Sequence, residues 1–145
     1  MVEEGNLDLS EAWFEYALLK KEDFSAKWIN PETVAPNPQI NQPASILRRA
    51  FKLDRTENAR IYSTAHGIYV LYINGCRVSE NVLTPGTSEY RHRLPYQTFD
   101  VSEYLHTRKN KLEVVLGDGW YRGSNGNTGT RNVLGQMLLF CSSRR

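Results

Sequence analysis

The residues best suited to chemistry lie in one stretch, VVLGDGWYRG at 114–123, and in the loop that follows it. Within eight residues the chain offers Asp118, Trp120, Tyr121, Arg122 and Asn125. Aromatic rings stack on the C–H faces of a sugar, while carboxylate, amide and guanidinium groups bind its hydroxyls. These side chains therefore predict a sugar-binding site.

Two of these residues also have a purely structural interpretation. Trp120 can equally be an anchor in the core, and Asp118 can cap its own turn by accepting hydrogen bonds from backbone N–H groups. Successive side chains in extended backbone point to opposite sides, so Trp120 and Tyr121 are not expected to face one site. For Trp120 the sequence favours neither interpretation over the other. For Asp118 it favours a ligand role.

Signatures of catalysis are missing from the sequence. The three histidines, His66, His92 and His106, do not have the spacing of a metal site, so each is expected to be structural. No GxSxG motif occurs, and the glycines of 117–126 lack the Lys-Ser/Thr pair of a phosphate loop. Cys76 and Cys141 form no CxxC motif. The sequence predicts no catalytic residue in this chain.

Length and composition suit one domain covering 1–145, with a 40% apolar fraction and a net charge of +2. Residues 1–32 carry eight acidic groups against three lysines, which leaves the remainder basic but without a clustered nucleic-acid face. No apolar run approaches the ~18 residues of a membrane span, and the N-terminus is acidic where a signal peptide is basic. These features predict that the chain binds neither nucleic acid nor membranes. They also predict a cytoplasmic location.

Short apolar runs separated by turn residues indicate an all-β, antiparallel protein with little helix. The expected strands are 45–53, 59–65, 68–75, 96–101, 111–117 and 135–141. Both faces of the 68–75 strand are apolar, which predicts a central position. The Asn74-Gly75 pair that ends it predicts a tight hairpin, with 76–83 returning antiparallel.

Two further segments are expected to be irregular, and one short helical turn is expected between strands. The range 30–45 holds four of the six prolines and predicts an extended surface crossing. The Gly/Asn loop at 123–132 has no apolar residue, so it is expected to be a mobile tip or to be ordered by a ligand or ion. Ser102 is a candidate cap for a single helical turn.

Several ordered stretches resemble a known family over most of the chain, from about Asp8 to Phe140. They are DLSEAWFEYALLKKEDFSAKWI, ILRRAFKL, ARIYSTAHGIYVLYINGCRVSENVLTPGTSEYRHRLPYQTFDV and LEVVLGDGWYRG. Together they are similar to the N-terminal β-sandwich region of bacterial α-L-rhamnosidases of glycoside hydrolase family 78. The resemblance implies a jelly-roll-like sandwich of the galactose-binding type. It also implies that catalysis, of the inverting kind with two carboxylates, belongs to a separate (α/α) barrel that is absent here.

The resemblance also implies candidate ligands. The GDGW match makes Asp118 a candidate for binding a sugar or a calcium ion, with Asn125, Asn127 or Asn132 as further oxygen donors. Tyr90, in PGTSEY, is another sugar-binding candidate, while Thr87 in the same stretch replaces an aromatic residue of the family pattern.

The implied role is that of an accessory domain. The tail CSSRR ends where the family continues, so the chain is expected to be an N-terminal domain or fragment of an α-L-rhamnosidase without catalysis of its own. Its expected partners are a rhamnose-containing glycan and the catalytic domain of the parent enzyme. Two alternatives stay open: a purely structural domain that packs against the barrel without a sugar site, and an independent lectin.

Overall fold

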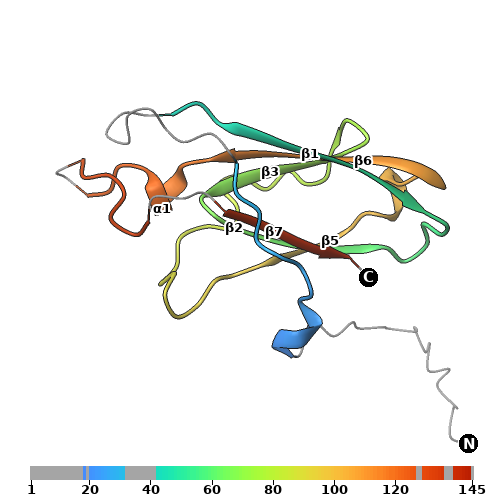
Figure 1. Ribbon diagram of the computed structural model, residues 1–145, viewed down its shortest axis with the longest axis horizontal. Helices are drawn as coiled ribbons and strands as arrows, with labels where there is room; N and C mark the ends of the chain where they lie inside the picture. Colours follow the sequence, from blue (N-terminus) through green and yellow to red (C-terminus); the bar gives the residue numbers. More distant parts are fainter. Residues whose placement is uncertain (1–17, 19, 32–41, 127–128, 136–138, 145) are drawn as a thin grey trace, which may run out of the picture.

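The protein is a sandwich of two antiparallel sheets with very little helix (Figure 1). The structure, a computed structural model, describes residues 18, 20–31, 42–126, 129–135 and 139–144. The four-stranded sheet has the order β1-β6-β3-β4, and the three-stranded sheet has the order β5-β2-β7. The strands are β1 (Ser45–Leu53), β2 (Arg60–His66), β3 (Ile68–Ile73), β4 (Cys76–Arg77), β5 (Gln97–Asp100), β6 (Arg108–Gly117) and β7 (Leu139–Arg144).

The helical elements are single turns. They are η1 (Lys21–Asp23), η2 (Ser102–Tyr104) and α1 (Gly119–Arg122). No helix in the described ranges is long and apolar enough to cross a membrane. This architecture confirms the all-β antiparallel sandwich, and each of the six predicted strands is present, the strand 45–53 at its predicted bounds and the other five with shifted ends.

The core lies between the two sheets because the strands alternate apolar side chains toward one another. In β3, Tyr69, Leu71 and Ile73 are buried while the residues between them are partly exposed. Tyr69 meets Phe140 of the opposite sheet in an edge-on ring contact, with the ring centroids 5.4 Å apart. β3 lies between β6 and β4, so the predicted central position is confirmed.

Two tight connections set the geometry of the sandwich. Asn74 and Gly75 both have positive φ, at 52° and 87°, which is the conformation that a two-residue hairpin requires, and the predicted Asn-Gly turn is confirmed. At the other end of β3, Gly67 alone joins β2 to β3 with a φ of 122°. A glycine tolerates this backbone, so one residue carries the chain from one sheet to the other.

The prediction that Ser102 caps a helical turn is wrong, although the turn itself exists as η2. The carboxylate of Asp100 accepts a hydrogen bond from the Ser102 N–H at 3.0 Å. The Ser102 hydroxyl instead accepts one from the Ala59 N–H, also at 3.0 Å, and so ties η2 to the start of β2. An aspartate two residues before a backbone N–H competes well for this local bond. Most of the proline-rich crossing, at 32–41, lies outside the described residues.

Candidate functional site

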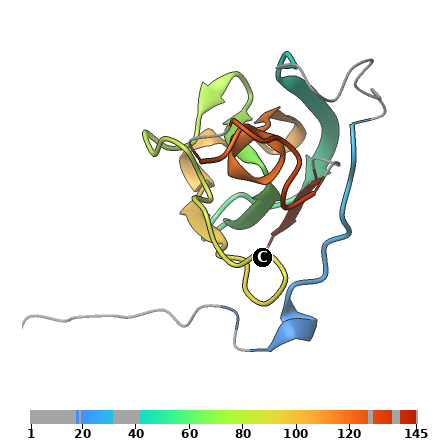
Figure 2. The same cartoon turned by 90° about the vertical axis from the view of Figure 1, so that its left-hand side faces the viewer.

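The candidate site lies at one end of the sandwich, where β6 passes into α1 and the loop behind it. Figure 2 looks onto this end and shows α1 and the described parts of the loop after it, 123–126 and 129–135, in orange and red, in front of the strands. Residues 119–122 form a helical turn closed by backbone bonds from Arg122 to Asp118 and from Gly123 to Gly119. The expectation of extended backbone here is therefore wrong, because a local ion pair between residues 118 and 122 supports a turn.

Asp118 is the centre of an ion cluster formed by Asp118, Arg122 and Arg131. Its Oδ1 atom accepts hydrogen bonds from Nε and Nη2 of Arg122, at 2.8 and 2.5 Å, and its Oδ2 atom accepts one from Nη2 of Arg131. The three side chains are only 14%, 11% and 5% exposed respectively. Asp118 makes no side-chain capping bond to α1, so the turn-capping interpretation is wrong. Its carboxylate binds two arginines rather than its own backbone.

The ion cluster also orders the loop that follows α1. Arg131 belongs to this loop, so its bond to Asp118 ties the returning arm to the turn. Asn125 donates from Nδ2 to the Trp120 carbonyl at 2.6 Å, and its N–H donates to the Thr130 carbonyl at 2.9 Å. The described part of the loop is thus held by contacts within the chain, a possibility that the sequence did not suggest.

The surroundings of Asp118 do not suit a calcium ion. Calcium takes about six to eight oxygen ligands, most of them anionic or carbonyl groups. Both oxygens of Asp118 face guanidinium groups, which repel a cation. Among the described residues no three His, Cys, Asp or Glu side chains are grouped as a metal site would need. Asn127, one of the proposed donors, lies outside the described residues. Calcium binding at Asp118 stays a prediction, and this geometry disfavours it.

Beside the ion cluster, four rings from distant parts of the chain meet in what we call the four-ring cluster: Trp28, His66, Tyr90 and Tyr121. His66 stacks on Tyr121 with centroids 4.4 Å apart, and Trp28 lies against His66 at 4.9 Å. Tyr90 contacts both His66 and Tyr121 edge-on, at 5.8 and 5.0 Å. These separations are those of favourable ring pairs. Trp28 keeps 43% of its surface exposed.

Close backbone approaches place Tyr121 in this cluster. A Cβ on Gly119 would lie 2.7 Å from Ile68 Cγ2 and 3.1 Å from the Gly67 carbonyl carbon, so α1 packs directly against the corner between β2 and β3. His66 is the last residue of β2, immediately before that corner. A Cβ on Gly135 would lie 2.2 Å from the Tyr121 hydroxyl. The glycines therefore allow the rings to meet.

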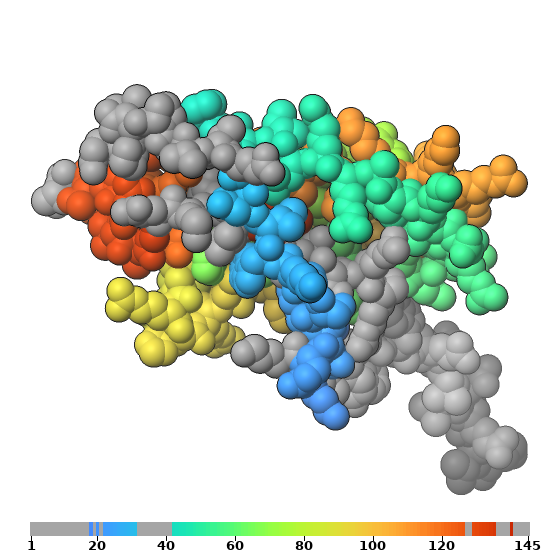
Figure 3. Space-filling model, viewed as in Figure 1, coloured from blue at the N-terminus to red at the C-terminus, as the bar shows by residue number. Residues whose placement is uncertain are grey.

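Trp28 reaches the cluster through the segment 20–31. Its neighbour Ile29 exchanges two backbone hydrogen bonds with Phe140 of β7, at 2.9 and 3.0 Å. Figure 3 shows this segment, in blue, lying across the front of the molecule. This backbone pairing fixes the position of Trp28 along β7, and so places its indole ring against His66.

The neutral form of His66 is favoured in this cluster, because burial lowers the pKa of its imidazole below the reference value of 6.5. The unfolded chain therefore takes up a proton before the folded chain does. We expect the free energy of unfolding to fall as the pH drops below about 6.5, until the folded imidazole also titrates. Urea unfolding at several pH values would measure the slope.

The matched control keeps the ring and removes the titration. In His66→Phe, the free energy of unfolding should lose the part of its pH dependence that His66 causes. His92→Phe, at an exposed position, should keep the pH dependence of the native chain. Equal pH slopes in the native chain and in His66→Phe would contradict the assignment.

Of the six candidate sugar-binding residues, the structure brings together two groups. Tyr90 and Tyr121 meet in the four-ring cluster, and Asp118 and Arg122 meet in the ion cluster. Asn125 bonds within its own loop. Trp120 is partly buried and lies outside the cluster of buried residues and the side chains packed against it, which does not support a core anchor. Whether any of them binds sugar stays a prediction.

The sequence did not predict three residues that meet at this end of the sandwich: Trp28, His66 and Arg131. Trp28 and His66 are 38 positions apart, and their contact depends on the fold. Arg131 carried a weak signal, since a lone cation in a polar loop close to Asp118 is a natural counter-charge. Nothing in the local sequence distinguished His66 from the other two histidines.

Comparison with known proteins supplies a context for this geometry. The family described as the alpha-L-rhamnosidase N-terminal domain matches residues 54–143. A curated α-L-rhamnosidase of Formosa agariphila is 34% identical over 119 residues, which are 78% of this chain and 13% of that protein. The solved α-L-rhamnosidase of Aspergillus terreus superposes with a TM-score of 0.81 at 31% identity, over 90% of this chain and 15% of that chain.

A further solved structure is that of the Streptomyces avermitilis α-L-rhamnosidase complexed with L-rhamnose. It superposes with a TM-score of 0.68 at 34% identity, over 72% of this chain and 10% of that chain. This chain thus spans between 10% and 15% of the length of these three relatives.

Proposed function

This chain belongs to the family of α-L-rhamnosidase N-terminal domains, and from that premise we propose that it is an accessory domain that helps an α-L-rhamnosidase to recognise rhamnose-containing glycans. The supporting observation is the four-ring cluster at the end of the sandwich, where Trp28 offers an exposed ring. An exposed ring can stack on the C–H face of a sugar. In this proposal hydrolysis belongs to another part of the parent polypeptide.

The state of Asp118 refines which residues contact the sugar. Its two oxygens already accept bonds from Arg122 and Arg131, so the ion cluster shapes the site rather than binding hydroxyls through that carboxylate. Trp28 and Tyr90 are then the principal contact residues, with Tyr121 supporting them through His66. A single sugar offers little area, so we expect a dissociation constant of about 1 mM, or about −4 kcal/mol.

Titration with L-rhamnose, followed by the indole N–H signals in NMR spectra, tests this proposal. Trp28→Ala should weaken binding by about tenfold, because a ring contact is worth about 0.5–1.5 kcal/mol beyond its buried area. Trp120→Ala should leave the affinity unchanged. A loss of binding in Trp120→Ala alone would place the site at Trp120 and contradict the role of the four-ring cluster.

The rival function is that of a purely structural domain packing against the catalytic barrel. The observation that favours it is the exposure of large apolar side chains away from the four-ring cluster, with Val82 71% and Leu83 53% exposed. An absence of rhamnose-induced shifts at tens of millimolar would rule against glycan recognition and leave this structural function standing.

A further inference from the structure

An apolar row crosses the outer face of the four-stranded sheet. The strand register places Ile46 of β1, Val115 of β6 and Val70 of β3 side by side. Their neighbours Val114 and Leu71 are buried, so these three alternate positions lie on the opposite, outer face. Ile46 is 50% exposed. The outer face of an antiparallel sheet is usually polar when it meets water, so this row indicates a covered surface.

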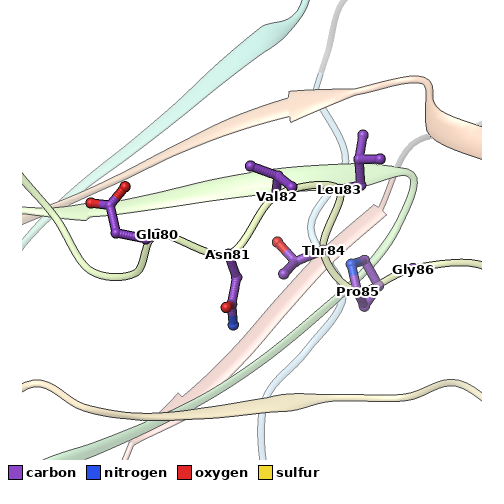
Figure 4. Close-up of a pocket in the computed structure, with 7 residues that line it drawn as sticks. All are labelled: Glu80, Asn81, Val82, Leu83, Thr84, Pro85 and Gly86. Atoms are coloured by element: carbon purple, nitrogen blue, oxygen red, sulfur yellow. The ribbon is translucent and has the colours of Figure 1, made fainter.

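The row continues beyond β3 into the segment 79–84. Thr84 pairs with Tyr69 through a backbone bridge, which sets this segment against the part of the β3 edge that β4 leaves unpaired, next to Val70. Figure 4 shows Val82 and Leu83 pointing to one side of the segment and Asn81 to the other. The same segment lines an open hollow at the surface. Val82, the most exposed large apolar side chain of the described residues at 71%, and Leu83, at 53%, thus stand at the end of this row.

The segment presents these side chains rigidly. Thr84 donates from Oγ1 to the Tyr69 carbonyl at 2.7 Å, and Gly86 N–H donates to the Leu83 carbonyl at 2.8 Å. Arg77 donates from Nη2 to the Asn81 carbonyl at 3.0 Å. Leu83 has a φ of 57°, a left-handed conformation that costs a side chain with a Cβ about 1–2 kcal/mol.

Charge distinguishes the two ends of the outer face. Beyond the apolar row, the register sets Arg48 opposite Glu113, then Ala50 opposite Lys111, then Lys52 opposite Lys109. Glu113 accepts from Arg48 at 2.6 Å and from Lys111 at 3.1 Å. Glu113 is thus the one carboxylate among four cations on these rows of β1 and β6, and it contacts only two of them. A surface that covers this face should be apolar at one end and acidic at the other.

We propose that the outer face of the four-stranded sheet docks onto another domain of the parent polypeptide, one that presents an apolar patch to Ile46, Val115 and Leu83 and carboxylates to Lys52 and Lys109. The relatives are several times longer than this chain, so they contain ample surface of their own to cover it. A second copy fits poorly. Two copies face to face would set cations against cations, or cations against the apolar row.

This docking rests on the proposed function only in requiring further domains in the parent polypeptide; it does not require sugar binding.

The test compares cysteine labelling by a maleimide in the 145-residue chain and in the parent polypeptide. Val82→Cys is the reporter and Glu57→Cys, on the turn after β1, is the control, both combined with Cys76→Ser and Cys141→Ser, which remove the two native thiols of the chain. We expect Val82→Cys to react at least about tenfold more slowly in the parent, with less than about a twofold change at Glu57→Cys.

Each result decides the matter. Equal labelling of Val82→Cys in chain and parent would overturn the docking while leaving the accessory role intact. A parent polypeptide without further domains would overturn both. A dimer of the isolated chain that Val115→Lys dissociates would assign the face to a second copy and overturn the proposal. Slow labelling in the parent that Val115→Lys restores would support it.

Discussion

Asp118→Asn is expected to lower the free energy of unfolding by about 3–5 kcal/mol, the usual cost of breaking a buried ion pair from one side. The carboxylate supplies the charge that Arg122 and Arg131 share, and both guanidinium groups are almost wholly buried. An asparagine keeps the shape and one acceptor but removes the charge. Urea unfolding followed by circular dichroism would give the difference.

The matched control is Asp100→Asn. Asp100 also pairs with an arginine, Arg60, but its side chain is 59% exposed. Exposed pairs contribute about 0–1 kcal/mol, so this variant should stay close to the native chain. A loss of less than about 1 kcal/mol in Asp118→Asn as well would show that the ion cluster does not hold the loop.

Gly119→Ala is expected to cost about 2–4 kcal/mol and to move Tyr121 away from His66. Two effects add. Gly119 has a φ of 52°, which strains any residue with a Cβ, and the new Cβ would lie 3.0 Å from the Ile68 backbone nitrogen. Backbone cannot move aside as a flexible side chain can. The free energy of unfolding and the ring-current shifts of the His66 protons would report the two consequences separately.

Gly126→Ala separates the strain from the clash. Gly126 has a similar φ of 66°, but a Cβ there would meet nothing within 4 Å. Its substitution should cost only about 1–2 kcal/mol, the left-handed conformation alone, and should leave the His66 shifts unchanged. Equal losses in the two alanine variants would contradict the close packing of α1 against the corner between β2 and β3.

The strand pattern was readable because it depends on local sequence. Alternation along 68–73 and the turn residues Asn74-Gly75 predicted a central strand and its hairpin, and the register confirms both. Turn α1 was not readable. Four residues are too few for a helical period, and the turn depends on the ion pair between residues 118 and 122 and on space beside Ile68.

The site was predicted only in part, because only some of its residues are neighbours in the sequence. Tyr121 and Arg122 stand in one aromatic and polar stretch, which marks this end of the chain for chemistry without saying what each side chain meets. Their partners come from elsewhere. His66 ends a strand of the other sheet, Trp28 precedes the whole sandwich, and Arg131 returns from the loop.

The sequence by itself determined the fold class, the strands and the family context, because periodicity and turn chemistry act over a few residues and the quoted motifs are ordered along the chain. Only the tertiary structure decided that Asp118 binds two arginines, that Tyr121 stacks on His66 and that one apolar row crosses the outer sheet. Apart from the local pair of Asp118 and Arg122, each of these contacts joins residues distant in sequence. Sheet register and close backbone packing set them, and no local pattern encodes either.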